Sequence, residues 1–138
     1  MYILAILSLL AALSEGDWEQ RLGPDRYRVM RKKGTEMSYS GHHLPPSEKT
    51  LYLCAACELP IFRSEEQFDV GNGWPNFTYP FAKENVYYVE DWSLGFKRYE
   101  VLCRGCDGHL GHVFNDGPPP KCLRYCINSI CLKIENKD

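Results

Sequence analysis

The chain has 138 residues, of which 44% are hydrophobic and 25% are charged, and its formal net charge at pH 7 is -2. This composition is typical of one globular domain and excludes a disordered or fibrous chain. The near balance of 16 basic and 18 acidic residues also excludes the broad positive field that nucleic-acid binding needs. We therefore expect a single monomeric domain without a nucleic-acid partner.

An apolar run after Met1 resembles the hydrophobic region of a signal peptide, and the small residues Ala12 and Ser14 favour cleavage after Ser14. The run is too short for a stable membrane span, which takes about 20 residues. No basic residue precedes it, so an apolar N-terminal helix or a misplaced start is the alternative. We interpret residues 1–14 as a signal peptide and 15–138 as the functional domain. The protein would then be secreted or periplasmic, and otherwise cytoplasmic.

One short helix is predicted over residues 24–34. Pro24 suits a first helical turn, Gly34 suits the position after the last turn, and basic residues precede that glycine. Residues 34–49 are rich in glycine, serine, proline and histidine without a period, which predicts an irregular segment. Downstream, short runs of β-branched and aromatic residues predict a mostly antiparallel β domain. Its expected strands cover residues 50–53, 86–89, 97–102, 111–114 and 123–134.

Two Cys-x-x-Cys pairs predict a metal site. Cys54 with Cys57, and Cys103 with Cys106, each set two thiolates on a tight turn from which both can reach one tetrahedral ion. Four soft ligands favour zinc and leave no open coordination position, so the ion would be structural. The stretch between the pairs exceeds the roughly 15 to 20 residues of a zinc ribbon, so the ion would join distant segments. The alternatives are two disulfides, or a redox motif, which would need a βαβ setting that the sequence does not offer.

Of the three remaining cysteines, Cys126 is the candidate nucleophile. In a strand, Arg124, Cys126 and Asn128 share one face, and a guanidinium beside a thiol favours the reactive thiolate. We therefore expect the pKa of Cys126 to lie below the value of about 8.5 of a free thiol. The alternative reading is an inert buried cysteine. Cys131 is expected to face the opposite side of the strand.

Two further segments supply candidate site residues. His109 and His112 lie in a short glycine-containing turn, where either can donate a proton near neutral pH. They could instead bind metal, but four cysteines already complete a zinc shell. The loop over residues 71–77 presents Trp74 and Phe77, either as plain core or as the wall of an apolar pocket.

In their order along residues 22–134, these motifs resemble those of the methionine-R-sulfoxide reductase B family. So many motifs in one order are specific, although each is short. They are Tyr27, Lys33-Gly-Thr-Glu36, Tyr52-x-Cys-x-x-Cys57, Gly73-Trp-Pro-x-Phe77, Asp91-x-Ser-x-Gly95, Arg98-x-Glu-Val101, Cys103-x-x-Cys106, His109-Leu-Gly-His-Val-Phe114, Asp116-Gly-Pro118 and Arg124-Tyr-Cys-Ile-Asn-Ser129.

The resemblance implies a mainly β fold of two antiparallel sheets with short N-terminal helices. It also implies reduction of methionine-R-sulfoxide in oxidised proteins or peptides, in which a thiolate attacks the sulfur and leaves a cysteine sulfenic acid. Thioredoxin or another dithiol would then restore the thiol. The implied structural zinc lies on Cys54, Cys57, Cys103 and Cys106, the nucleophile is Cys126, and substrate-site roles fall to Trp74, His109, His112, Arg124 and Asn128.

The chain departs from the family pattern at four positions. Asn72 occupies the usual place of a resolving cysteine, Asn76 replaces a serine, and Glu58 replaces a common glycine. Cys122 also replaces a glycine, and it would strain its proline-rich turn if φ there is positive. Cys122 is nevertheless the candidate resolving thiol for Cys126. An extended chain would hold the two Cα atoms roughly 13 Å apart, against the 4.4 to 6.8 Å of a disulfide, so the turn would have to bend.

Two other classes of function are rivals. A zinc-ribbon-like binding module predicts zinc without turnover, but it leaves Cys126, His109 and His112 without a role. A secreted disulfide scaffold predicts at most one free thiol, whereas a zinc enzyme leaves three cysteines free.

Overall fold

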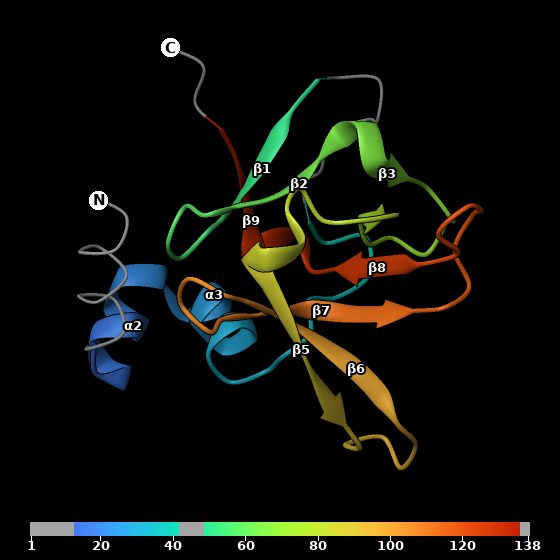
Figure 1. The fold of residues 1–138 in the computed structure, drawn as a ribbon. Helices are drawn as coiled ribbons and strands as arrows, with labels where there is room; N and C mark the ends of the chain where they lie inside the picture. The colour runs from blue at the N-terminus through green and yellow to red at the C-terminus, as the bar shows by residue number, and fades with distance from the viewer. Residues whose placement is uncertain (1–12, 42–48, 136–138) are drawn as a thin grey trace.

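Nine short strands form two antiparallel sheets in the part of the chain that the computed structural model describes, residues 13–41 and 49–135 (Figure 1). The smaller sheet has the order β2-β1-β9 and the larger β3-β4-β8-β7-β6-β5. Together with two short N-terminal helices, they confirm the predicted fold class. The strands are β1 (Leu51–Cys54), β2 (Pro60–Arg63), β3 (Gln67–Phe68), β4 (Asn76–Phe77), β5 (Val86–Asp91), β6 (Arg98–Cys103), β7 (His109–Phe114), β8 (Arg124–Ile127) and β9 (Leu132–Ile134).

Two N-terminal helices are present, as the family resemblance implied, whereas the local helix signals of the sequence revealed only one of them. Helix α3 (Pro24–Met30) begins at the expected proline but ends before Gly34. Helix α2 (Glu15–Leu22) escapes prediction because only Trp18 of it is buried, so its apolar period is weak. Its start is fixed by Ser14, which forms a reciprocal capping box with the third residue of the helix.

The segment interpreted as a signal peptide lies outside the described residues, except for Leu13 and Ser14. Leu13 packs against the core and Ser14 caps α2, so cleavage after Ser14 would remove both contacts. Among the described residues, no helix has the length and apolar character that crossing a membrane requires. The signal peptide stays a prediction.

The strand expected over residues 123–134 is interrupted, which corrects that prediction. Strand β8 is followed by a 3-10 helix, η3 (Ser129–Cys131), and the chain then enters the other sheet as β9. The backbone N–H groups of Ser129 and Ile130 donate to the Glu36 carboxylate, at 2.8 and 3.0 Å, instead of to a neighbouring strand. This acceptor comes from a distant part of the sequence, so local strand propensity cannot reveal it.

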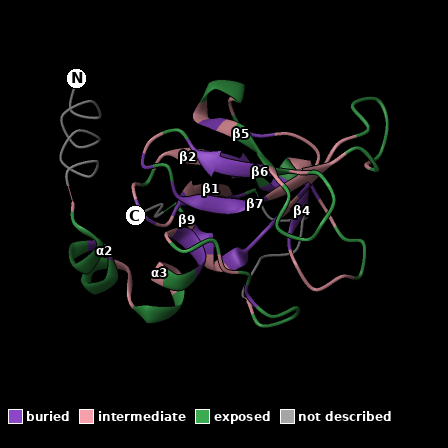
Figure 2. Cartoon of the chain, turned by 90° about the horizontal axis from the view of Figure 1, so that it is seen from below, coloured by how far each residue is buried: buried purple, intermediate pink, exposed green. Residues whose placement is uncertain are grey.

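The core lies between the two sheets. Phe62 of β2 stacks on Phe77 of β4 with ring centroids 4.3 Å apart, and Tyr125 of β8 meets Phe62 edge-on at 5.7 Å. Trp18 of α2 and Met30 of α3 close the core from the helical side. Figure 2 shows the buried residues gathered on the strands, while much of the surface of α2, α3 and several loops is exposed. The aromatic rings of the core come from both sheets, so their packing holds the sheets together. Truncating one buried aromatic residue costs about 3 to 5 kcal/mol of stability.

Candidate active site and metal centre

Four cysteine thiols lie together where the two sheets meet. Cys54 ends β1 of the smaller sheet, and Cys103 ends β6 of the larger. The Sγ atoms of Cys54 and Cys106 are 3.7 Å apart, those of Cys57 and Cys103 are 3.5 Å apart, and all four lie within 4.8 Å of one another. Ligands about 2.3 Å from a tetrahedral ion would be roughly 3.8 Å apart, whereas a disulfide bond is about 2.05 Å long. The separations fit a shared metal ion and exclude two disulfides.

Both cysteine turns close in the same way. Glu58 donates its backbone N–H to the carbonyl of Cys54, and Asp107 donates to that of Cys103, each at 2.8 Å. Glu58 has a φ of 67° and Asp107 a φ of 62°, a left-handed conformation that costs a residue with a Cβ atom roughly 1 to 2 kcal/mol. Glu58 therefore carries a strain that glycine would not have at this position.

Five of the six predicted substrate-site residues line one pocket of about 280 Å³. Strands β7 and β8 bring three of them together, because His112 pairs in register with Cys126, and Arg124 lies two residues before Cys126 on the same strand. The loop before β4 adds Trp74, and the end of β8 adds Asn128. His109 is the predicted site residue that does not line the pocket.

The Cys126 thiol is partly buried in this pocket. Burial raises the pKa of Cys126 above its ordinary value, while the Arg124 guanidinium and the Asn72 amide act to lower it. The expected lowering of this pKa is therefore wrong in direction, since desolvation outweighs the guanidinium. Asn72 Nδ2 lies 3.9 Å from the sulfur, so the residue at the usual resolving position contacts the Cys126 thiol.

Arg124 is held on three sides. Its Nε and Nη2 atoms donate to the Asp116 carboxylate at 2.8 and 3.2 Å, and its guanidinium lies 4.6 Å from the ring centroid of Phe114. Its Nη1 donates to Asn76 at 3.1 Å, and Asn76 donates to Asn72 at the same distance. In the sequence, these two asparagines stand out only as departures from the family pattern. Their position in the loop of Trp74 was the one available signal for their role.

The two histidines have different surroundings. His109 is buried, and its Nδ1 lies 2.7 Å from Glu100 Oε2. His112 lines the pocket, and its Nε2 lies 2.7 Å from Asp91 Oδ2, an atom that also accepts from Arg98 at 3.1 Å. An ionised carboxylate only accepts hydrogen bonds, so His109 Nδ1 and His112 Nε2 are the donors in these two bonds. No role for Asp91, Arg98 or Glu100 was predicted from the sequence. Of the two candidate proton donors, the geometry favours His112, because it lines the pocket and His109 does not.

Charge and burial act in opposite directions on His112. Burial lowers the pKa of His112, while the hydrogen bond to Asp91 raises it. The same hydrogen bond lowers the pKa of Asp91, so this carboxylate is ionised at neutral pH. His112 is therefore mainly neutral near pH 7 and takes up its second proton only in a minor fraction of molecules.

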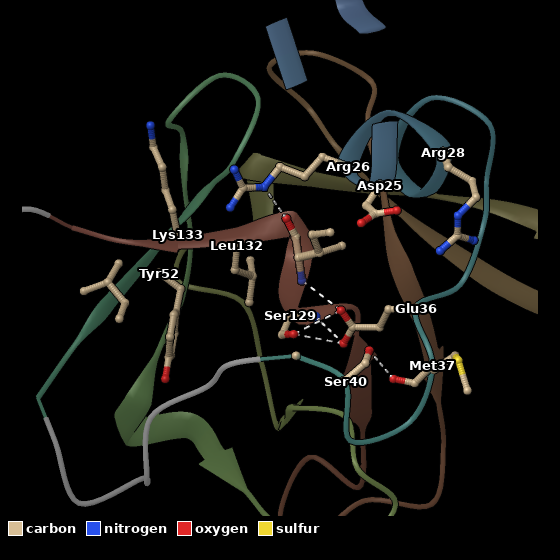
Figure 3. A pocket seen from close by; sticks show the side chains of 13 residues that line it. Asp25, Arg26, Arg28, Glu36, Met37, Ser40, Tyr52, Ser129, Leu132 and Lys133 are labelled. Carbon is tan, nitrogen blue, oxygen red and sulfur yellow. Dashed lines mark hydrogen bonds between the residues drawn. The ribbon is translucent and has the colours of Figure 1, made fainter. Parts of the chain in front are cut away.

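Glu36 connects this pocket to a larger hollow of about 520 Å³ beside α3, β1 and β9 (Figure 3). Its carboxylate accepts from the hydroxyl and N–H of Ser129 and from the N–H of Ile130. Its backbone N–H donates to Asn128 Oδ1 at 2.9 Å, and its carbonyl accepts from the Trp74 indole at 3.1 Å. Glu36 thus positions two pocket residues, although the motif that it ends gave no indication of this role.

The two remaining cysteines lie outside the pocket. Cys131 is buried, its Sγ donates to the carbonyl of His109 at 3.2 Å, and burial raises its pKa well above the ordinary value. Cys122 is exposed, and its φ of 61° is positive, so the expected strain in its turn is confirmed. That turn is closed by bonds from Cys122 N–H to Pro118 at 2.9 Å and from Gly117 N–H to Cys122 at 3.1 Å.

These features define a class of protein: a mainly β domain with a thiol in a polar pocket and a separate cysteine cluster suited to a metal ion. The SelR domain model matches residues 22–136. The chain therefore belongs to this family, the methionine-R-sulfoxide reductase B family, as the order of its motifs predicted. None of the seven cysteines forms a disulfide bond, so the rival class of a secreted disulfide scaffold is excluded.

Relatives bear the same family name. The peptide methionine sulfoxide reductase MsrB of Leptospira interrogans is 47% identical over 124 residues, which cover 90% of this chain and 95% of that protein. The protein of the same name from Pseudomonas syringae pv. syringae is 49% identical over 118 residues, or 86% of this chain and 90% of the relative. That from Pseudomonas entomophila is 47% identical over 122 residues, or 88% and 93%. The prediction of an oxidoreductase of methionine sulfoxide is thus confirmed at the level of the family.

Proposed function

We propose that this protein reduces methionine-R-sulfoxide in proteins or peptides, with Cys126 as the nucleophile. The observation that carries the proposal is that Cys126 shares one pocket with an imidazole, a guanidinium and an indole. The Cys126 thiolate attacks the sulfoxide sulfur and forms an S–S bond as the S–O bond breaks, and the oxygen takes up two protons and leaves as water. Water then adds to the Cys126 sulfur as the S–S bond breaks, which releases the thioether and one proton. The methionine sulfur gains two electrons, and Cys126 loses two as it becomes a sulfenic acid.

The other pocket residues divide the remaining work. His112 supplies the proton to the departing oxygen, and its ring is oriented by Asp91. Arg124 stabilises the thiolate, and Trp74 forms the apolar wall against the methyl group on the sulfur. Asn128 is locked by Glu36 and by the Leu110 carbonyl, so it keeps the end of β8 in place. His109 acts from behind the pocket as a buried support.

The direct test supplies peptide methionine sulfoxide as separate R and S epimers. We expect turnover of the R epimer and essentially none of the S epimer, because a fixed thiolate, acid and methyl pocket accept one handedness. Equal rates on both epimers, or activity on S alone, would reject the proposal. Cys126→Ser serves as the control and should abolish turnover while the fold is kept, because a hydroxyl is far less nucleophilic.

We propose that Cys54, Cys57, Cys103 and Cys106 hold one structural zinc ion. The four thiols lie at separations suited to a tetrahedral ion, and zinc prefers such a sulfur set. When bound, the ion joins the two sheets and so contributes to folding directly. Elemental analysis should find one zinc per chain, and Cys103→Ser should lose both the zinc and much of the stability. Active protein without any metal would overturn this assignment.

We propose that a thioredoxin-like dithiol restores Cys126, with Cys122 as an intramolecular resolving thiol. Cys122 is exposed and lies in the turn that leads into β8, whereas Cys131 is buried. One equivalent of sulfoxide without reductant should then form a disulfide between Cys122 and Cys126, with water as the second product. Peptide mapping that finds only sulfenic acid in the unmodified protein would instead assign direct reduction by the external dithiol. Cys122→Ser, which should accumulate the sulfenic acid, is the matched variant.

We propose that export removes residues 1–14. The support is their apolar character and the small residues before Glu15. N-terminal analysis of protein from its native host should find Glu15 first. Met1 or Tyr2 at the N-terminus would assign the protein to the cytoplasm.

A further inference from the structure

Three large apolar side chains stand exposed in the turn that joins β5 to β6. Trp92 and Leu94 are each 60% exposed, and Phe96 is 56% exposed. The hairpin projects beyond the rest of the larger sheet (Figure 1), and β5 is the edge strand of that sheet. Neighbouring exposed apolar side chains of this kind mark a surface that meets another molecule. We call these three residues the hairpin patch.

The base of this turn is a wall of the substrate pocket. Asp91 and Arg98 pair across the hairpin and form an ion pair at 3.1 Å. Arg98 lines the pocket, and Asp91 holds His112, which faces Cys126 across β7 and β8. The hairpin patch therefore starts directly after Asp91 and ends two residues before Arg98, beside the pocket that holds Cys126.

The register of the strands places the patch within reach of a bound peptide. Glu100 pairs with Val89 on one side and with His112 on the other, so the pocket face of the sheet extends to β5. Adjacent strands lie about 4.8 Å apart, so the three steps from β8 to β5 span roughly 14 Å. An extended peptide covers about 3.3 to 3.6 Å per residue, so roughly four residues bridge this distance.

Charge on the hairpin favours an apolar ligand. Glu90 pairs with Lys97 at 3.7 Å, and Asp91 pairs with Arg98, so the charges next to the patch are opposite in sign and cancel. The patch thus offers no net charge by which to select an acidic or a basic partner. What it offers is an indole, an isobutyl group and a phenyl ring.

We propose that the hairpin patch binds the substrate polypeptide beside the oxidised methionine and selects apolar side chains about three to five residues away from it. This inference rests on the proposed function. Such neighbours are typical of methionines that come from a protein core, and they are accessible only where the substrate is locally unfolded. The patch would direct the enzyme to chains whose apolar segments have become exposed.

The test compares three substrates: free methionine-R-sulfoxide, a peptide with leucine at both positions four residues from a central R-sulfoxide, and the same peptide with serine there. The variant carries Trp92→Ser, Leu94→Ser and Phe96→Ser, and Ile134→Ser, an exposed change on the other sheet, is the matched control. With dithiothreitol as reductant, we expect the triple variant to raise KM for the leucine peptide about tenfold, with kcat and the rate on free methionine sulfoxide unchanged. The control should behave as the native chain.

Each other outcome has a definite meaning. Equal KM values of the native chain for the two peptides, or a leucine preference that survives in the triple variant, would overturn the inference while leaving the reductase proposal intact. No turnover of any R-sulfoxide would instead reject the proposed function. If the native chain is a dimer and the triple variant a monomer, the patch binds a second copy. If, in a parallel assay with thioredoxin in place of dithiothreitol, the variant raises only the KM for thioredoxin, the patch binds the reductant. Both of these last results overturn the inference.

Discussion

Replacement of Arg124 by methionine tests how the pocket activates its thiol. Burial raises the pKa of Cys126, and the Arg124 charge counteracts this effect. Removing the charge should move the pKa further upward, so less thiolate is present at neutral pH. Alkylation and turnover should both slow there, and the loss should vanish at a pH high enough to ionise the thiol in both proteins.

The size of the effect follows from the strand. Arg124 and Cys126 lie two residues apart on β8, so their Cα atoms are separated by roughly 6.7 Å. Charges about 7 Å apart interact by roughly 0.6 kcal/mol in water and by about 2.4 kcal/mol at an effective dielectric constant near 20. Asp116 neutralises part of the guanidinium charge, and Arg124 is partly exposed, so the lower half of this range applies. We expect alkylation at pH 7 to slow by about threefold to tenfold.

The assay is the pH dependence of iodoacetamide alkylation, followed by peptide mass mapping in a Cys122→Ser background. Cys131 is fully buried, and the proposed zinc would protect the four cluster thiols, of which Cys57 is half-buried like Cys126, so Cys126 is the reactive thiol of the zinc-loaded protein. Arg124→Lys keeps the charge and should alkylate at nearly the native rate. A loss by the same factor at every pH would refute the electrostatic argument and assign Arg124 a purely structural role.

Three further predictions concern single side chains. Glu36→Gln should lower the free energy of unfolding by about 1 to 3 kcal/mol in urea titrations, because an amide cannot accept all the bonds that η3 donates; a loss well below this range would contradict that role. Cys122→Gly should raise stability by about 0.5 to 1 kcal/mol by relieving the positive φ, whereas Cys122→Ser should not, and calorimetry on both separates strain from loss of the thiol. Asp91→Asn should lower the pKa of His112, because the Asp91 carboxylate raises it. The alkaline limb of the pH profile of kcat should therefore move to lower pH, and an unchanged limb would exclude His112 as the proton donor.

The sequence by itself determined the family and the cysteine cluster and supplied the candidate nucleophile, because spacing within a motif is local. Cys-x-x-Cys pairs carry their turn geometry with them, and an alternating segment places Arg124 and Cys126 on one face wherever the strand lies. Strands β5, β6 and β7 were also predictable, since each is a short run of β-branched or aromatic residues between turn formers. Strands β2, β3 and β4 were not predicted. Strands β3 and β4 contain only two residues each, and β2 begins with a proline.

Only the tertiary structure decided which groups meet across the sequence. The Glu36 carboxylate ends β8 and starts η3 from far along the chain, so the predicted single strand became two strands in different sheets. Pairing of β5 with β6 and of β6 with β7 brought Asp91 to His112 and Glu100 to His109, so the two histidines have different partners although their ring centroids lie only 5.5 Å apart. The pKa of Cys126 also depended on this packing. Desolvation is set by everything that surrounds the sulfur, whereas the sequence reveals only its neighbours along the strand.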